Sequence, residues 1–212
     1  MVKLPIVKEG WVFIGGFALV TAIVALLIDP ILSIIPGILA LFMCFFFRNP
    51  SRDVPNDDTI IVSPADGTVM DVVEVDDSFV EEPCNKVIIF LSVFDVHVNR
   101  APIEGEIKYQ HYICGQYKPA FQKSVGWVNE RHSIGLDNGR VKILVTQIAG
   151  LLARRIVSWV TLGNVLEKGQ TYGLIKFGSC TEIVMPKSSV TVNVKKGDRV
   201  KGGVTVIGRI EK

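Results

Sequence analysis

The chain has 212 residues, enough for one domain after an apolar N-terminal segment, and its 23 basic and 21 acidic residues leave a net charge of only +2. That balance argues against a nucleic-acid-binding protein, and the sequence carries no zinc-finger, RNP or helix-turn-helix pattern. The four cysteines show no CxxC spacing, so we predict no metal site and no disulfide framework.

Two uncharged apolar runs, 11–28 and 31–47, occupy the N-terminus and are separated only by Asp29 and Pro30. Eighteen helical residues reach roughly 27 Å, about one hydrocarbon thickness. Basic residues flank the pair, namely Lys3 and Lys8 before it and Arg48 and Arg52 after it. The pattern predicts a hydrophobic α-hairpin over residues 1–47 that anchors the chain in the cell membrane, with both ends and the following domain on the cytoplasmic side.

Two other arrangements of this hairpin stay open. Pro36-Gly37 interrupts the second run, and both runs are near the minimum spanning length, which also fits a re-entrant or interfacial hairpin. A buried helical hairpin of a soluble protein has the same pattern. A cleaved signal peptide fits poorly, because a second apolar run follows and no small-residue cleavage site is evident.

From Arg48 onward, short β-rich runs alternate with turn residues, which predicts a mainly β, barrel-like or sandwich-like domain over residues 48–212. The segment 124–131 reads as a loop or short helix, and 151–159 is ambiguous. The predicted strands are 59–62, 67–75, 86–92, 105–112, 133–136, 141–148, 172–177, 182–185, 189–194 and 204–210.

A weak internal repeat lies in the second half of this domain. Residues 165–175 and 194–207 each read as a Lys-Gly turn, at Lys168-Gly169 and Lys196-Gly197, followed by an apolar strand. This is similar to the hammerhead half-barrel of biotinyl and lipoyl carrier domains. Any two β-hairpins share such glycine-bounded turns, so the alternative of unrelated hairpins stays open.

Three motifs occur in a specific order and spacing along the chain. They are Ser63-Pro64-Ala65-Asp66-Gly67-Thr68-Val69, then Asp95-Val96-His97-Val98-Asn99-Arg100-Ala101-Pro102, and finally Phe177-Gly178-Ser179-Cys180. Together they resemble the phosphatidylserine decarboxylase proenzyme family in its short-chain form, over about residues 47–212. The resemblance implies an enzyme of phospholipid biosynthesis that converts phosphatidylserine to phosphatidylethanolamine and CO2.

The resemblance also implies a covalent cofactor. In this family the chain cuts itself at the Gly-Ser bond, here Gly178-Ser179, and the serine becomes a pyruvoyl group that serves as an electron sink. The products would be residues 1–178, the β chain, and residues 179–212, the α chain, which stay together as a heterodimer. The other partner would be a phospholipid in the membrane, and a homo-oligomer stays open.

The chemistry of the cut predicts which residues assist Ser179. A serine hydroxyl is not acidic enough to attack unaided, so it needs a nearby base, and Gly178 leaves its own carbonyl open to close approach. The imidazole group of histidine suits proton transfer at neutral pH, and the resemblance assigns this role to His97. Asp66 would orient the imidazole as the third member of a serine triad does. Asp95, two residues before His97, is a rival for that role. Without the resemblance, His97 reads as a structural histidine and Asp66 as a turn residue.

The sequence departs from the family pattern at two positions. Longer members carry a second histidine three residues after the first, where this chain has Arg100, so both proton transfers would fall on His97. The residue after the family's serine is usually Thr or Ser, and here it is Cys180. A thiol at this position either assists the reaction or fills space.

Three arginines are candidates for the phosphate or carboxylate of the substrate: Arg154 and Arg155, which fall in a stretch resembling the family, and Arg100. The Asn129-Glu130-Arg131 stretch also matches the family, in a segment expected to cover the site.

The alternative functions are of different classes. A membrane-anchored biotinyl or lipoyl carrier would share the half-barrel, but Met185-Pro186-Lys187 matches its lysine hairpin poorly. A membrane serine hydrolase would use Ser179, His97 and Asp66 without self-cleavage, although the chain lacks a GxSxG elbow. An anchored, non-enzymatic β scaffold would show no cleavage and no activity.

Overall fold

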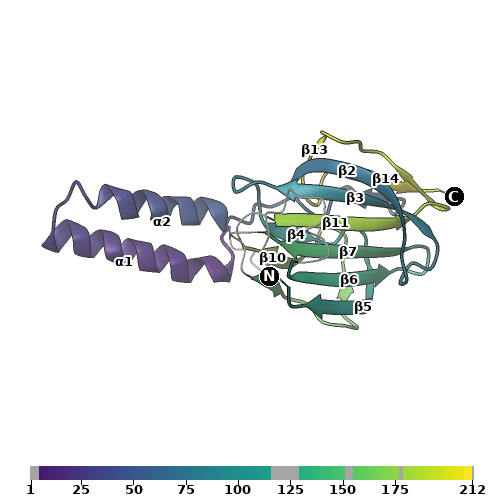
Figure 1. Ribbon diagram of the computed structural model, residues 1–212, viewed down its shortest axis with the longest axis horizontal. Helices are drawn as coiled ribbons and strands as arrows, with labels where there is room; N and C mark the ends of the chain where they lie inside the picture. Colours follow the sequence, from purple (N-terminus) through teal and green to yellow (C-terminus); the bar gives the residue numbers. More distant parts are fainter. Residues whose placement is uncertain (1–4, 116–128, 151–154, 177–178, 212) are drawn as a thin grey trace. The chain divides into compact units, whose positions relative to one another are not determined.

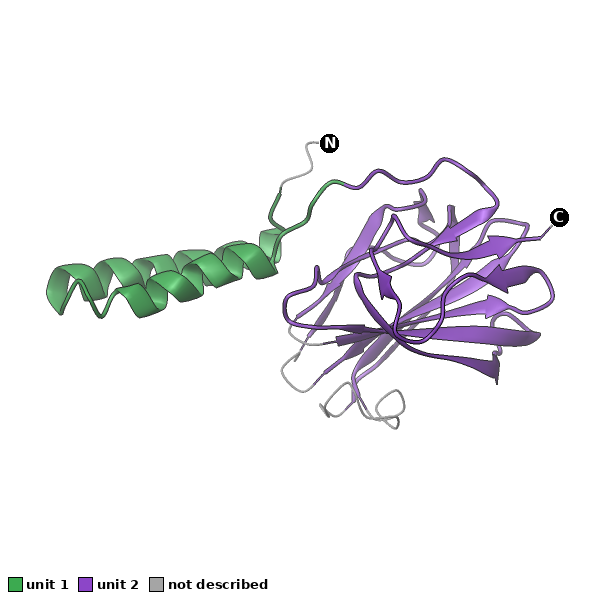
Figure 2. Cartoon of the chain, turned by 90° about the horizontal axis from the view of Figure 1, so that it is seen from above, with its two compact units in different colours: residues 1–51 green, residues 52–212 purple. Residues whose placement is uncertain are grey.

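The computed structural model describes residues 5–115, 129–150, 155–176 and 179–211. The chain forms two compact units, Met1–Ser51 and Arg52–Lys212, shown in separate colours in Figure 2. Most of the segment predicted as a loop or short helix at 124–131, and residues 151–154 of the ambiguous segment, lie outside the described residues.

The first unit confirms the predicted apolar helices. A 3-10 turn, η1 (Lys8–Gly10), leads into α1 (Trp11–Leu27), and α2 (Ile34–Phe46) follows after a short turn. The carboxylate of Asp29 holds that turn by accepting the backbone N–H of Ile31 at 2.7 Å. No residue of α1 is buried, and Leu26 is 82% exposed. By length and composition, Lys8–Leu27 is sufficient to cross a membrane.

The second unit is built from strands, as predicted. Each of the ten predicted strands is present, and four short strands that the sequence pattern did not predict are added: β4, β8, β9 and β13. In chain order the strands are β1 (Ile60–Val62), β2 (Gly67–Asp76), β3 (Pro83–Leu91), β4 (Val98–Arg100), β5 (Gly105–Ile113), β6 (Arg131–Asp137), β7 (Lys142–Ala149), β8 (Ile156–Ser158), β9 (Val165–Leu166), β10 (Thr171–Ile175), β11 (Ser179–Pro186), β12 (Val190–Val192), β13 (Arg199–Val200) and β14 (Val206–Ile210).

The strands form a curled, eight-stranded half-barrel sheet and two small sheets. The large sheet has the order β13-β2-β3-β11-β7-β6-β5-β9, and the small sheets have the orders β1-β14-β12 and β4-β10-β8. All strand pairs are antiparallel. In Figure 1, β11 lies between β3 and β7, in the interior of the large sheet. A strand in this position is hydrogen-bonded along both edges, so its residues are held more firmly than those of an edge strand.

The two predicted Lys-Gly turns are present. Gly169 and Gly197 have φ values of 77° and 94°, the left-handed region that favours glycine. The strands that follow them are β10, which lies in a small sheet, and β13, which lies at the edge of the large sheet.

One large apolar cluster fills the β unit, and Ile89, Leu91, Ile143 and Ile183 are among its fully buried members. Several polar side chains are buried as completely as these. They are Ser63, His97, Asn99, Gln147, Ser179 and Thr181, all 0% exposed. Because a buried polar group is costly unless it is hydrogen-bonded, such a concentration marks a part of the molecule with a specific role.

Candidate active site

Ser179 is the first residue of β11, three residues before the start of the corresponding predicted strand, 182–185. Its neighbours across the sheet are Leu91 of β3 and Ala149 of β7. The side chain is fully buried, and its Oγ has no hydrogen-bond partner among the described residues. An unpartnered buried hydroxyl costs about 1–3 kcal/mol and is rare, so it favours a chemical role over a structural one. Gly178, the other half of the predicted cleavage site, lies outside the described residues.

His97 lies directly before β4, in the connection that follows β3, and is fully buried. Its Nδ1 is 3.0 Å from the backbone carbonyl oxygen of Asp95. Because a carbonyl oxygen only accepts, Nδ1 carries a proton here, and in the neutral ring Nε2 is then the nitrogen that takes up a second one. The ring is therefore held in the tautomer that a general base needs.

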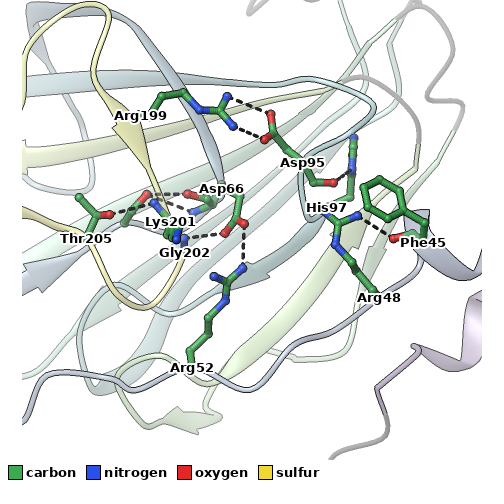
Figure 3. A network of polar contacts seen from close by, with 12 residues as sticks. Phe45, Arg48, Arg52, Asp66, Asp95, His97, Arg199, Lys201, Gly202 and Thr205 are labelled. Atoms are coloured by element: carbon green, nitrogen blue, oxygen red, sulfur yellow. Dashed lines mark hydrogen bonds and ion pairs between the residues drawn. The ribbon is translucent and has the colours of Figure 1, made fainter.

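Asp66 lies in the turn before β2. Its Oδ2 accepts a hydrogen bond from Arg52 Nη2 at 2.7 Å, and its Oδ1 accepts one from the backbone N–H of Gly202 at 2.7 Å (Figure 3). The side chains of Arg52 and Asp66 are 12% and 15% exposed, so the pair is largely removed from water. The Nδ1 of His97 meets a backbone carbonyl, and the orientation of the ring by Asp66 stays a prediction.

Asp95, the rival carboxylate, binds a different arginine. Arg199 of β13 donates to it with two nitrogens, at 2.6 and 3.4 Å (Figure 3). The backbone N–H of Ser92 also donates to it, at 2.9 Å. Burial opposes the ionisation of Asp95, but the hydrogen bonds from Arg199 and Ser92 outweigh it, and the pKa of Asp95 lies below its ordinary value. Asp95 therefore orients His97 through its carbonyl oxygen while its charged side chain fixes the loop.

Backbone hydrogen bonds bring the three motifs together. The N–H of Ile175, four residues before Ser179, donates to the carbonyl of His97 at 3.1 Å. The N–H of Arg100 donates to the carbonyl of Pro64, two residues before Asp66, at 2.9 Å. Segments far apart in the sequence thus converge, as the resemblance implies.

Cys180 faces the opposite side of β11 from Ser179. It packs in a small apolar cluster with Ile148, Ile88 and Phe90. Burial is the main cause that raises the pKa of the Cys180 thiol far above its ordinary value. A thiol in this environment stays protonated and fills space.

The three candidate arginines differ in their surroundings. Arg154 lies outside the described residues, and Arg155 is exposed. Arg100 is 2% exposed, and its Nη1 donates to the carbonyl of Gly169 at 3.1 Å. Burial, and then the nearby charge of Arg52, lower the pKa of Arg100.

Sequence reasoning missed Arg52 and Arg199, because each arginine is far in sequence from the aspartate that it binds. Of the Asn129-Glu130-Arg131 stretch, Glu130 accepts hydrogen bonds from the Tyr112 hydroxyl at 2.9 Å and from the N–H of Ile156 at 3.2 Å. Among the residues that the structure describes, no group of three or more His, Cys, Asp or Glu side chains is arranged to hold a metal ion.

The fold and the site define a class of protein: a β-sheet domain with a buried serine at the start of an interior strand and a buried histidine whose Nδ1 contacts a backbone carbonyl. Comparisons with known proteins are more specific. The family model for phosphatidylserine decarboxylase matches residues 39–208. The chain therefore belongs to the phosphatidylserine decarboxylase family.

Similar proteins cover almost the whole chain. A protein of Carboxydothermus hydrogenoformans named phosphatidylserine decarboxylase proenzyme is 50% identical over 212 residues, covering 99% of each chain. A protein of the same name from Symbiobacterium thermophilum is 49% identical over 207 residues, covering 97% of this chain and 95% of the relative. Another, from Geotalea uraniireducens, is 39% identical over 205 residues, with 96% of each chain covered. Family membership favours a decarboxylase over the carrier and hydrolase alternatives.

Proposed function

We propose that the chain cuts itself between Gly178 and Ser179 and then, with the pyruvoyl group derived from Ser179, decarboxylates phosphatidylserine to phosphatidylethanolamine. The observation that carries the proposal is the buried, unpartnered Oγ of Ser179 in a chain whose relatives are named proenzymes of this activity. Such a hydroxyl is desolvated and not tied up by another acceptor, so it is available to attack.

The cut needs one proton acceptor and one water molecule. Ser179 Oγ bonds to the carbonyl carbon of Gly178 while its proton passes to His97 Nε2, and the Gly178–Ser179 amide bond breaks to leave an ester and a free amine. Elimination then moves the Cα proton of residue 179 to His97, which has given its first proton to the new amine, and breaks the ester Cβ–O bond as a Cα=Cβ double bond forms. Residue 178 leaves with a carboxylate, and hydrolysis of the remaining dehydroalanine releases ammonia and leaves the pyruvoyl group at residue 179.

The contacts around β11 suit a new chain end at residue 179. Pairing with β3 runs from Ser179 to Pro186 and pairing with β7 runs from Ser179 to Val184, so the strand stays held on both sides after the cut. Arg199 of the piece 179–212 also binds Asp95 of the piece 1–178. We infer that the two pieces remain one heterodimer because much of the core is shared between them.

During turnover the pyruvoyl group supplies an electron sink for the carbon that loses CO2. His97, held through Nδ1 by the carbonyl of Asp95, would accept at Nε2 the proton that the substrate ammonium group loses, and would return it to that carbon. Burial of the site excludes water around the substrate carboxylate, which favours loss of its charge as CO2. Asp66 holds Arg52 and the Gly202 backbone at the border of the site. Arg100, Arg154 and Arg155 are the candidate partners for the phosphate and carboxylate of the lipid.

We further propose that residues 1–47 anchor the enzyme in the cell membrane with the β unit on the cytoplasmic face. The apolar side chains of α1 are exposed, which water does not favour but lipid does. A maleimide that cannot cross membranes should label the exposed Cys114 in inverted vesicles and spare it in right-side-out vesicles. Labelling from the outside alone would place the β unit on the other face.

The test of the function is intact mass spectrometry of the purified full chain, followed by an assay on phosphatidylserine vesicles. We expect a piece of residues 179–212 whose amino terminus is a ketone, the complementary piece 1–178, and release of CO2. A single chain of full mass after incubation with lipid at neutral pH would overturn self-cleavage. A cut chain that leaves the vesicles unchanged would overturn the choice of substrate.

A further inference from the structure

A continuous chain of polar side chains crosses the interior of the β unit and ends on the strand of Ser179. Thr181 Oγ1 accepts a hydrogen bond from Asn99 Nδ2 at 2.9 Å, and Asn99 Oδ1 accepts one from Gln147 Nε2 at 2.9 Å. Gln147 Oε1 lies 3.2 Å from His132 Nδ1, and His132 Nε2 lies 3.0 Å from Gln110 Nε2. All but Gln110 are buried.

Backbone groups at the two ends fix the direction of every hydrogen bond in this chain. At one end, the N–H of Leu162 donates to Gln110 Oε1 at 2.9 Å, and Gln110 Nε2 donates to the carbonyl of Val160 at 3.2 Å. At the other end, Asn99 Nδ2 lies 3.4 Å from the carbonyl of Pro64. Turning over any one side-chain amide would place donor against donor or acceptor against acceptor. The hydrogen bonds between these side chains therefore all run in one direction.

The polarity also determines the state of His132. Gln110 donates to its Nε2, and its Nδ1 donates to Gln147, which requires a neutral ring with the proton on Nδ1. Burial lowers the pKa of His132, although the hydrogen bond with Gln147 opposes this effect. The ring is therefore a fixed link at neutral pH.

Asn99 is the junction at which this chain meets all three motifs. It lies two residues after His97, its Nδ2 bonds to Thr181, two residues after Ser179, and the same nitrogen approaches the carbonyl of Pro64, two residues before Asp66. One amide group thus touches the three segments that carry the candidate catalytic residues.

The backbone makes room for this junction. Gly173 of β10 lies opposite Asn99, and a Cβ on it would be 2.9 Å from Gln147 Nε2 and 2.6 Å from the carbonyl oxygen of Val157. Real Cβ atoms essentially never come so close to other heavy atoms, so any side chain at this position would push Gln147 away from Asn99.

We propose that Asn99, held by Gln147 and His132, is a positioning residue that fixes Thr181, and with it Ser179, for self-cleavage of the chain. The inference rests on the proposed self-cleavage. Thr181 and Ser179 point to the same face of β11, because side chains two apart on a strand do. A shift of about 1 Å at a reacting atom is enough to slow a reaction by orders of magnitude. Loss of the hydrogen bond between Asn99 and Thr181 should therefore lower the rate of self-cleavage measurably.

The test compares self-cleavage rates in full-length chains made by cell-free synthesis into lipid vesicles, pulse-labelled and then chased. Thr181→Val keeps the shape of the side chain but loses the acceptor for Asn99, and we expect cleavage to slow about tenfold or more. Thr181→Ser restores a hydroxyl and should recover most of that loss. Asn99→Leu removes the junction and should slow cleavage at least as much.

The matched control is Thr146→Val. Thr146 is also buried in the large sheet, and its hydroxyl pairs with that of Ser133 at 2.8 Å, but it lies on the opposite face from Gln147. We expect this variant to cleave at the wild-type rate. The thermal midpoint of each variant, measured in the uncut Ser179→Ala background, should fall by similar amounts for Thr181→Val and Thr146→Val.

The outcomes separate the inference from the proposed function. If Thr181→Val is cut as fast as the wild type, or if Thr146→Val is slowed equally, Asn99 does not position Ser179. If the wild type itself is never cut, the proposal of self-cleavage is wrong, and so is the inference that rests on it. A slowed Thr181→Val that Thr181→Ser does not rescue also contradicts the inference, because volume rather than the hydroxyl would then decide the rate.

Discussion

Ser179→Ala should leave the chain as a single uncut polypeptide with no decarboxylase activity. The methyl group has no lone pair to attack the carbonyl of Gly178, and no pyruvoyl group can form. The variant should still fold, because the Oγ that it removes is buried without a partner among the described residues and so contributes nothing to stability. Intact mass spectrometry of the purified chain measures the result directly.

Cys180→Ala is the matched control for this prediction. Its thiol is buried in an apolar cluster on the other face of β11, where burial holds it protonated, so its loss should leave the site of the cut unchanged. Removing the thiol leaves a small cavity, which we expect to lower stability by about 1 kcal/mol. An uncut Cys180→Ala chain together with a cut Ser179→Ala chain would show that the nucleophile is Cys180 and not Ser179.

His97→Gln should slow self-cleavage by about 10²–10⁴-fold, the usual contribution of general acid–base catalysis. A glutamine amide can donate to the carbonyl of Asp95, as Nδ1 does now, so the loop should keep its shape. The amide nitrogen cannot take up the serine proton at neutral pH. The fraction of cut chain over time after a pulse label measures the rate.

His111→Gln is the control for His97→Gln. His111 is exposed on β5, and its ring is tilted by 59° against that of Tyr109, with ring centroids 6.2 Å apart. It should mature at the wild-type rate. Normal maturation of His97→Gln would show that another group takes the proton from Ser179, and the assignment of His97 as the base would be wrong.

The sequence alone predicted the helices, the mainly β domain and the motifs that carry the site. The apolar runs at the N-terminus are long and uncharged, and the strands of the large sheet alternate with clear turn residues, so both patterns are local. Local patterns missed β4 and β8, which have three residues each. Strands so short have too few residues to show a period, and pairing with β10 is what makes them strands.

The position of Ser179 shows a second limit of local patterns. The sequence pattern predicted this strand only from residue 182 onward, whereas β11 begins at Ser179. The residues from Ser179 to Thr181 are small or polar, and nothing in them predicts that flanking strands on both sides would bury them. That burial comes from the ladders with β3 and β7.

Only the tertiary structure decided the partners of the site residues. Sequence reasoning did not find that Arg52 and the backbone of Gly202 bind Asp66, or that Arg199 binds Asp95. Asn99 belongs to one of the three motifs, but the sequence did not predict its hydrogen bonds with Thr181 and Gln147. The physical reason is that residue type and spacing determine which chemistry a segment can perform, whereas a hydrogen bond depends on distance and direction between atoms that only the folded chain brings together.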